Sequence, residues 1–251
     1  MSSDTRADIR RHVAVLAPLP LELEAVVAAF GLAPSDDPDL WTGHLGASAV
    51  TAVRAGMGPE AAAAAAGRLL EGPPPPAGPV AHLMSVGICG GLDPDIDVGT
   101  VLRPERVVDH ATGAVYRHTT ATGADRQGTL VTTAEVHFDD GLSRRMLAEG
   151  GVGVDMESSA VARVAEERGS AWSVHRAISD RWVDGLLDPR VVALTAVDGS
   201  MDLEGLTRLL ADEPDLVPRL ERLADDTVRA ARQAAEDAVR GCLALDGPGA
   251  G

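Results

Sequence analysis

The sequence has few cysteines, few aromatic side chains and no long hydrophobic run. Only two cysteines occur, Cys89 and Cys242, and they stand far apart. This excludes a disulfide framework and is typical of a protein of the reducing cytoplasm. Aromatic residues make up 2% of the chain and hydrophobic residues in total 45%, so Ala, Val and Leu must build the core. No apolar segment approaches the ~20 residues that a membrane-spanning helix requires, and the polar start MSSDTRADIRRH has no apolar signal core. We therefore expect a cytoplasmic protein with no membrane span.

Positive charge is also scarce. Lys and Arg together number 22 against 38 for Asp and Glu, which gives a formal net charge of -16. A surface of this charge repels phosphate backbones, so we expect no nucleic-acid partner and favour a small ligand. His110, His118 and His137 lack the spacing of metal ligands, and no histidine stands where it would activate the Cys89 thiol. We therefore expect no metal site and no cofactor.

What the chain does contain is a regular alternation of short apolar segments and helical segments. Helices are predicted over 21–30, where Gly31 stops the helix, over 59–72, which begins with a proline, and over 158–169. The tail over 203–245 is predicted to form two helices separated at Pro214 and Pro218, with the charged segment 224–239 on the solvent side. The predicted strands lie in 12–17, 41–58 (two strands with a turn near Gly46), 79–92, 99–119 (a meander), 127–138, 150–157 and 171–180.

This alternation predicts a single α/β domain over residues 1–251 with a mostly parallel or mixed sheet. Residues 1–11 are expected to be disordered, and residues 203–251 to hold the C-terminal helices. The proline run 73–76 is expected to be a rigid surface loop within this domain.

Polar residues and glycines follow several of these strands at their carboxyl ends, where open α/β sheets bind their ligands. Each has a structural alternative: Glu22 and Glu24 in a first helical turn favour the positive end of the helix dipole, and Asp180 could cap the next segment. Two acids around a methionine, between an apolar strand and a small-residue helix, are poorly placed for packing and favour a ligand. The polar strand ends are Glu22 and Glu24, the turns RAGMG and SVGICGG, Asp155 and Glu157, and Ser179 and Asp180.

Taken together, six motifs resemble the purine nucleoside phosphorylase/nucleosidase superfamily. They are APLPLELEAV, RAGMGPEAAAAAAG, SVGICGGLDPDIDVGTV, GTLVTTAEV, VDMESSAVARVA and RAISD, in the order of that family. Within the superfamily they look most like 5′-methylthioadenosine/S-adenosylhomocysteine nucleosidases, and the segment from LTAVDGSMDLEGL onward resembles the hopanoid-associated branch. The resemblance implies a three-layer nucleoside phosphorylase-like α/β fold, with a central mixed β-sheet flanked by helices. It also implies an enzyme that cleaves the N-glycosidic bond of a purine, adenine-type nucleoside, and a homodimer or a larger homo-oligomer.

The resemblance further implies a role for each matching residue. Asp180 would be the general acid that protonates N7 of the leaving purine, with Ser179 orienting it and burial raising its pKa. Glu22, or alternatively Glu24, would accept a proton from the attacking water. The ribose would be held by Glu157, because a carboxylate can accept from both hydroxyls of a vicinal diol. The other expected substrate-binding residues are Met156 beside the ribose, Asp155 orienting its loop, the glycine turns with Gly58, Gly87, Ile88 and Cys89, and the purine-stacking position Val136, for which His137 or Phe138 could substitute.

Water or phosphate could be the nucleophile in such a cleft. In phosphorylases of the superfamily an arginine and a serine flank the glycine turn after the third strand, and the corresponding positions here are Ser85 and Ile88. This departure favours hydrolysis, and Arg54 is left as the residue that could still reach a phosphate. A phosphorylase on the same scaffold and a non-catalytic nucleoside-binding protein stay open as alternatives, although a binder has no need of a proton donor at Asp180. The short segment between VVDH and GTL further predicts a pocket that accepts a bulky 5′ group.

Overall fold

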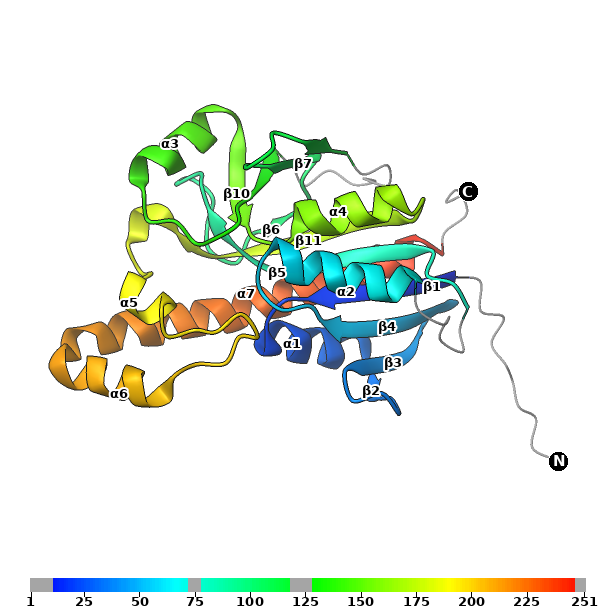
Figure 1. The fold of residues 1–251 in the computed structure, drawn as a ribbon, viewed down its shortest axis with the longest axis horizontal. Helices are drawn as coiled ribbons and strands as arrows, with labels where there is room; N and C mark the ends of the chain where they lie inside the picture. Colours follow the sequence, from blue (N-terminus) through cyan, green and yellow to red (C-terminus); the bar gives the residue numbers. More distant parts are fainter. Residues whose placement is uncertain (1–10, 72–77, 118–127, 247–251) are drawn as a thin grey trace.

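The computed structural model describes residues 11–71, 78–117 and 128–246. One mixed sheet runs through these residues, with helices on both of its faces (Figure 1). The strands are β1 (Arg11–Ala17), β2 (Ala33–Pro34), β3 (Leu40–Leu45), β4 (Ser48–Arg54), β5 (His82–Gly91), β6 (Val101–Leu102), β7 (Arg106–Asp109), β8 (Val115–Tyr116), β9 (Thr129–Thr132), β10 (Gly151–Asp155) and β11 (Ala171–Arg181). The helices are α1 (Pro20–Phe30), α2 (Pro59–Glu71), α3 (Asp140–Ala148), α4 (Ser158–Glu167), α5 (Pro189–Val192), α6 (Leu203–Asp212) and α7 (Val217–Ala244), with short 3-10 turns at Trp182–Asp184 and Pro214–Leu216.

The long strand β5 lies at the centre of the sheet. It runs parallel to β1 on one side and to β11 on the other, and β1 in turn runs parallel to β4. Its last two residues pair antiparallel with β10, which continues the sheet through β9, β7 and β8. As a result the carboxyl ends of β1, β5 and β11 lie at the same edge of the sheet, and β10 approaches that edge from the opposite direction.

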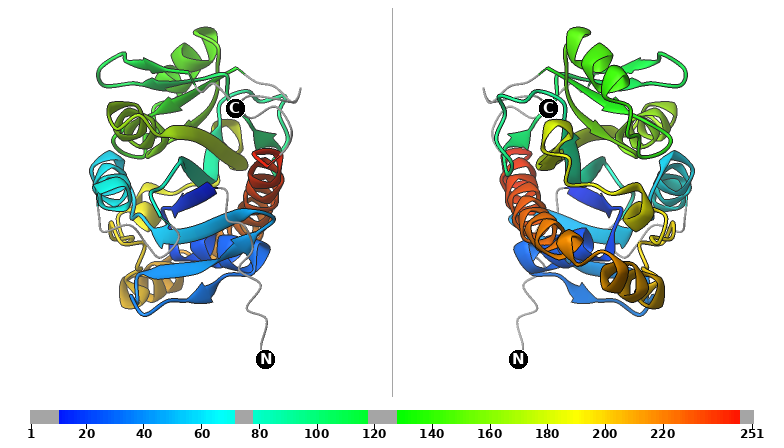
Figure 2. Two further views of the ribbon diagram at one scale, coloured as in Figure 1. Left: turned by 90° about the vertical axis from the view of Figure 1, so that its right-hand side faces the viewer. Right: turned by 90° about the vertical axis from the view of Figure 1, so that its left-hand side faces the viewer.

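Strand β1 shows why helices cover both faces. Its side chains alternate, so that Val13 and Val15 pack in one apolar cluster with residues of α1 and α7, whereas Ala14 and Leu16 pack in another with residues of α2 and α4. All four side chains are buried, which is why the strand is one unbroken apolar run rather than an alternating one. Figure 2 shows α2 and α4 on one side of the sheet and α7 on the other. The predicted α/β fold with a mixed sheet between helical layers is confirmed.

The first two helices begin and end close to where the sequence predicts. Helix α1 starts at Pro20, and Gly31 ends it in the left-handed conformation, with a φ of 65° that glycine adopts without strain. Helix α2 starts at Pro59, where the missing N–H would have had no partner within the helix. Gly31 therefore locates the end of α1 and Pro59 the start of α2 correctly from the sequence, whereas α1 begins one residue earlier than predicted, and the predicted end of α2 at residue 72 lies outside the described residues.

Two predictions in the middle of the chain are wrong. The strand expected over 127–138 is β9, which ends at Thr132, and the following residues form a loop that leads into a helix, α3, that the sequence analysis missed. The carboxylate of Asp139 begins α3 by accepting from the backbone N–H of Gly141. The meander expected over 99–119 is a hairpin of β7 and β8, because β6 pairs with β11 instead.

The C-terminal helix also differs from its prediction. The break at Pro214 is present, but Pro218 lies in the first turn of α7. The segment 224–239, expected to be solvated, buries a face of alanines together with Asp226 and Asp237. Small side chains allow α7 to lie close against β11 and β5. The alternating charges therefore mark the solvent-facing side of the helix, whereas its opposite side belongs to the core.

Several expectations fall on residues outside the described ones. These are the proline loop at 73–76, His118 and almost all of the segment 1–11. In the part of the chain that the structure describes, no helix has both the length and the apolar character needed to cross a membrane.

Candidate active site

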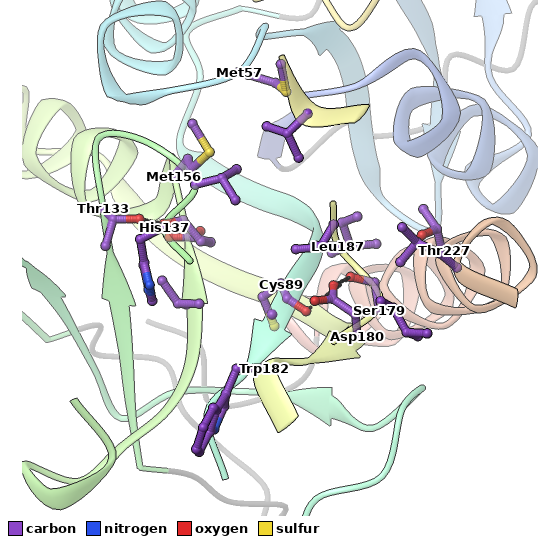
Figure 3. A pocket seen from close by; sticks show the side chains of 18 of the residues that line it. Met57, Cys89, Thr133, His137, Met156, Ser179, Asp180, Trp182, Leu187 and Thr227 are labelled. Atoms are coloured by element: carbon purple, nitrogen blue, oxygen red, sulfur yellow. Dashed lines mark hydrogen bonds between the residues drawn. The ribbon is translucent and has the colours of Figure 1, made fainter. Parts of the chain in front are cut away.

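A pocket of about 890 Å³ opens at the carboxyl ends of β1, β5 and β11 (Figure 3). Residues far apart in the sequence meet in its wall, including the three predicted acids Glu22, Glu157 and Asp180. The predicted residues that line the pocket are Glu22, Ile88, Cys89, Val136, His137, Asp155, Met156, Glu157, Ser179 and Asp180. Two predicted glycines, Gly58 and Gly87, lie behind this wall and not in it.

One buried arginine, Arg176 on β11, holds the centre of the site. Its Nε lies 3.0 Å from the carboxylate of Asp155, one terminal nitrogen lies 3.0 Å from Glu157, and the other lies 3.7 Å from Glu22. The same two terminal nitrogens also donate to the Ser85 hydroxyl and to the backbone carbonyl of Ile88. Its side chain is 1% exposed, so three carboxylates and one guanidinium share a site that water barely reaches.

The charges in this cluster shift one another's pKa values. Burial opposes the charge of Arg176, but the three carboxylates raise its pKa above the ordinary value, so it stays a cation. Burial raises the pKa of Glu157 to about 7, although Arg176 acts in the opposite direction. Burial also raises the pKa of Glu22, again against the influence of Arg176. With three acids for one base, the cluster is poised to hold an extra proton near neutral pH.

Glu22 is fixed by the backbone on both sides. Its two carboxylate oxygens accept from the N–H groups of Leu19 and Ile88, each at 2.7 Å. The hydrogen bond from the N–H of Leu19 closes the first turn of α1. The Glu22 side chain therefore caps the helix and lines the pocket at the same time. Glu24, the other candidate base, is exposed and lines a separate hollow against α7, so it does not face this pocket.

Two predicted glycines support the acids from behind: Gly58, in the turn before α2, and Gly87. The turn expected at Gly87 is wrong, because this residue lies within strand β5, which continues to Gly91. The N–H of Gly58, a residue with a φ of 90°, donates to Glu157 at 2.9 Å. At Gly87 a Cβ atom would lie 2.2 Å from a carboxylate oxygen of Glu22 and 2.6 Å from Arg176. A larger residue in place of Gly87 would therefore displace the central ion pair.

The hydrogen-bond partner of Asp180 is Ser179, which does not belong to the Arg176 cluster. Figure 3 shows the Asp180 carboxylate beside the hydroxyl of Ser179, which donates to it at 2.7 Å. The Ser179 hydroxyl also lies 3.3 Å from the carbonyl oxygen of Cys89. Burial raises the pKa of Asp180, while the bond from Ser179 lowers it. A carboxyl group of this kind can carry a transferable proton closer to neutral pH than an exposed aspartate.

Cys89 and Arg54 give no sign of a further chemical role. Cys89 is buried in the core beside the pocket, and burial raises the pKa of its thiol, which keeps it protonated. Arg54 is exposed at the end of β4 and does not line the pocket. Among the described residues, no group of three or more His, Cys, Asp or Glu side chains is arranged to hold a metal ion.

Two pocket residues were missed by the sequence analysis. Arg176 belongs to the motif RAISD but received no role, although a cation inside the apolar strand AWSVHRAIS is itself a signal, since a buried charge needs partners. Trp182 follows two positions after Asp180 and brings an aromatic ring to the pocket wall (Figure 3). Its indole N–H donates to the Leu92 carbonyl at 2.8 Å, and Arg144 lies over its ring, 5.2 Å from the centroid. The predicted purine-stacking position, Val136, lies on the loop between β9 and α3 and also lines the pocket.

Comparisons with known proteins agree with this architecture. A family model described as the phosphorylase superfamily matches residues 12–148 and 124–209. A 5′-methylthioadenosine/S-adenosylhomocysteine nucleosidase from S. pneumoniae, solved with a transition-state inhibitor, superposes with a TM-score of 0.68 at 17% identity, over 94% of this chain and 100% of that chain. The S-adenosylhomocysteine nucleosidase of Streptococcus pyogenes gives 0.68 at 14% identity, over 94% and 97%. Futalosine hydrolase of Helicobacter pylori gives 0.66 at 12% identity, over 94% and 98%. A comparison with curated protein sequences gives no match.

Proposed function

Because the chain belongs to the phosphorylase superfamily, we propose that it is an enzyme that hydrolyses the N-glycosidic bond of a purine nucleoside, with an adenine-type base. The observation that carries this proposal is the convergence of Glu22, Glu157 and Asp180 in one pocket. Solved structures of nucleosidases and of a futalosine hydrolase have the same fold as this chain. In the proposed reaction Asp180 supplies the acid, Glu22 the base and Glu157 the acceptor for the ribose diol.

The departing base needs a proton, and Asp180 is the group suited to give it. A general acid works best when its pKa is near the working pH, and burial moves Asp180 in that direction. Ser179 holds one carboxylate oxygen and leaves the other for a ring nitrogen of the base. Trp182, on the same wall, offers an apolar surface on which a purine can stack.

The sugar belongs at Glu157. One of its oxygens accepts from Gly58 and the other from Arg176, which orients the carboxylate toward the pocket. A carboxylate oxygen has a second lone pair, so each can also accept from a ribose hydroxyl. Its negative charge then stabilises the positive charge that develops on the sugar as the glycosidic bond breaks.

Water fits the remaining role better than phosphate. Each nitrogen of the Arg176 guanidinium already has a protein acceptor, and Arg181, the other arginine of the wall, is held by Asp184 and by the Pro94 carbonyl. A phosphate would find these donors taken and would meet the carboxylate of Glu22. A water molecule, by contrast, can give its proton to Glu22, whose raised pKa makes it a stronger base than an ordinary glutamate.

The pocket is large enough for more than a simple nucleoside. Its volume lies near the upper end of the ~300–1,000 Å³ that is usual for small-molecule sites. Leucines and a valine line the part near α5 and α7, which suits an apolar substituent; they are Leu186, Leu187, Val192 and Leu223. We infer that a bulky 5′ group is accepted, and a strong preference for methylthioadenosine over adenosines with a large 5′ substituent would contradict this.

One experiment tests the reaction. The purified protein is incubated with a panel of purine nucleosides, with and without phosphate, and free base and sugar product are quantified. Release of base and a free ribose derivative at a rate that phosphate does not change supports hydrolysis. Phosphate-dependent formation of a ribose 1-phosphate would identify a phosphorylase, and binding without release of base would identify a nucleoside-binding protein.

A further inference from the structure

Asp155 lines the pocket, but its carboxylate is taken up by donors of the protein itself. One oxygen accepts from the Thr132 hydroxyl at 2.7 Å. The other accepts from the backbone N–H of Ser158 at 3.1 Å and from the Ser158 hydroxyl, and it forms an ion pair with Arg176, whose Nε lies 3.0 Å away. The N–H of that Nε donates to the Ser158 hydroxyl oxygen at 3.4 Å, so Ser158 connects the carboxylate and the guanidinium. Three hydrogen-bond donors and the guanidinium therefore surround a carboxylate that offers about four lone-pair positions. Asp155 differs in this from Glu157, whose two oxygens each accept one hydrogen bond from the protein.

Among the partners of Asp155, Arg176 is the one that also contacts the other two acids of the cluster. A guanidinium is planar and its donors form a rigid fork, so a partner on Nε fixes the direction of both terminal nitrogens. In this structure one of those nitrogens reaches Glu157 at 3.0 Å and the other lies 3.7 Å from Glu22. The orientation of two carboxylates of the pocket wall thus depends on the ion pair that Arg176 forms with a third carboxylate, that of Asp155.

Three hydrogen bonds, one from Thr132 and two from Ser158, fix the carboxylate of Asp155 and so allow it to hold Arg176 in one orientation. Thr132 is the last residue of β9, and Ser158 is the first residue of α4. Asp155 itself ends β10 and has a side chain that is 1% exposed. Its carboxylate is consequently anchored to a neighbouring strand and to a helix start, and it presents a rigid acceptor to the guanidinium.

We propose that Asp155 is a positioning residue, which holds Arg176 in the plane where the guanidinium orients Glu157 and Glu22 toward the substrate. This rests on the proposed function, since it assumes that those two glutamates act on a bound nucleoside. It assigns Asp155 no contact with the substrate, in contrast to the substrate-binding role that the sequence suggested. It also predicts an electrostatic signature, because the charge of Asp155 is one of the causes that raise the pKa of Glu157.

The test compares Asp155→Asn with the matched variant Asp109→Asn. Asp109 ends β7 and accepts from the hydroxyl of Ser159, the neighbour of Ser158, at 3.0 Å, but it does not line the pocket. We expect Asp155→Asn to lower kcat/KM about 100-fold, mainly through kcat, because the misoriented carboxylates no longer meet the developing charge. Its acidic limb in the pH profile of kcat/KM should move to lower pH, because Glu157 loses a negative neighbour. Asp109→Asn should stay within about threefold of the unsubstituted protein, with the acidic limb unmoved.

Two results overturn the proposal: a folded Asp155→Asn variant that keeps kcat/KM within threefold, or one whose acidic limb does not move. If Asp155→Asn does not fold, Thr132→Val decides, because it removes one donor to Asp155, leaves the charge in place and keeps the Ser158 hydroxyl that accepts from Arg176. A fall in kcat of at least about fivefold supports positioning, and an unchanged kcat refutes it. Failure of the unsubstituted protein to cleave any nucleoside counts against the proposed function instead, so the two failures are distinguishable.

Discussion

Asp180 is the single residue on which the proposed proton transfer depends. Its carboxylate is buried, accepts from Ser179, and has a raised pKa. Asparagine keeps its shape but has no proton to give to a leaving base. Asp180→Asn is therefore expected to lower kcat about 10²- to 10⁴-fold, the usual contribution of a general acid, while ligand binding measured by calorimetry is retained. Asp225→Asn, at an exposed position of α7 that does not line the pocket, serves as the control. Unchanged turnover in Asp180→Asn would remove this mechanism.

His137 offers a second test at the scale of one side chain. Among the described residues its two ring nitrogens are buried and have no hydrogen-bond partner, and burial lowers its pKa. An unpaired buried polar group costs about 1–3 kcal/mol. His137→Phe keeps a ring and removes the unpaired nitrogens, so the free energy of unfolding in urea should rise by about 1 kcal/mol. The exposed His44→Phe is the control, and a less stable His137→Phe variant would show that the imidazole has a stabilising partner.

At the scale of elements, α7 is attached to the sheet by a buried polar chain. Asp237 on α7 accepts from His175 of β11 at 2.8 Å and from Nε of Arg103 at 2.9 Å. On its other side His175 lies 3.1 Å from the Ser173 hydroxyl. Gly241, one turn further along α7, makes room for this ring, because a Cβ there would lie 2.6 Å from it. The contacts join two elements that are remote in the sequence.

This attachment predicts a large stability effect far from the active site. Asp237→Asn removes the charge that pairs with Arg103 and weakens the buried bond to His175. Because the Arg103 side chain is 31% exposed and can be solvated, the expected cost is about 1–3 kcal/mol. The midpoint of urea denaturation should therefore fall markedly, whereas Asp225→Asn, exposed on the same helix, should change it little. Equal midpoints for the two variants would mean that the alanine face alone holds α7 in place.

The elements also show where sequence reasoning fails. Gly31 located the end of α1 and Pro59 the start of α2, because the backbone preferences of glycine and proline act locally. The burial of Asp237 could not be predicted, because its partners come from a strand and a loop more than 60 positions earlier. A pattern of charges shows that a helix has a polar face, but it does not show which of the charged residues lie at the edge of the apolar one.

For the whole molecule, the sequence predicted the fold class and the meeting of three acids, but it did not predict the arginine between them. Glu22 and Asp180 could be predicted because each follows a strand of the parallel set, whose carboxyl ends share an edge of the sheet. Glu157 follows β10, which runs antiparallel to β5, so its place in the pocket rests on the motif rather than on that rule. Arg176 depends on register instead: it lies beside Gly87 in the pairing of β11 with β5, and that glycine leaves the space that its guanidinium and Glu22 fill. Such pairing is a property of two strands together and cannot be deduced from either segment alone.

The excess of acids at the site should be visible in the stability of the molecule as a whole. Burial raises the pKa values of Glu22 and Asp180, and that of Glu157 to about 7 from an ordinary 4.5. A carboxyl group whose pKa is raised by folding stabilises the protein below its ordinary pKa, and this contribution is lost as the pH rises through the folded value. These three groups should therefore lower the free energy of unfolding between about pH 5 and pH 8.

Glu157→Gln isolates one part of this effect, because glutamine does not ionise. A difference of one pKa unit corresponds to about 1.4 kcal/mol, so the stability of Glu157→Gln relative to the unsubstituted protein should increase by about 1–3 kcal/mol from pH 5 to pH 8. The measurement is urea denaturation at several pH values, with the exposed Glu24→Gln as the control whose difference stays constant. Parallel stability curves for Glu157→Gln and the unsubstituted protein would mean that Glu157 is already ionised at pH 5, and that Arg176 outweighs burial at the centre of the site.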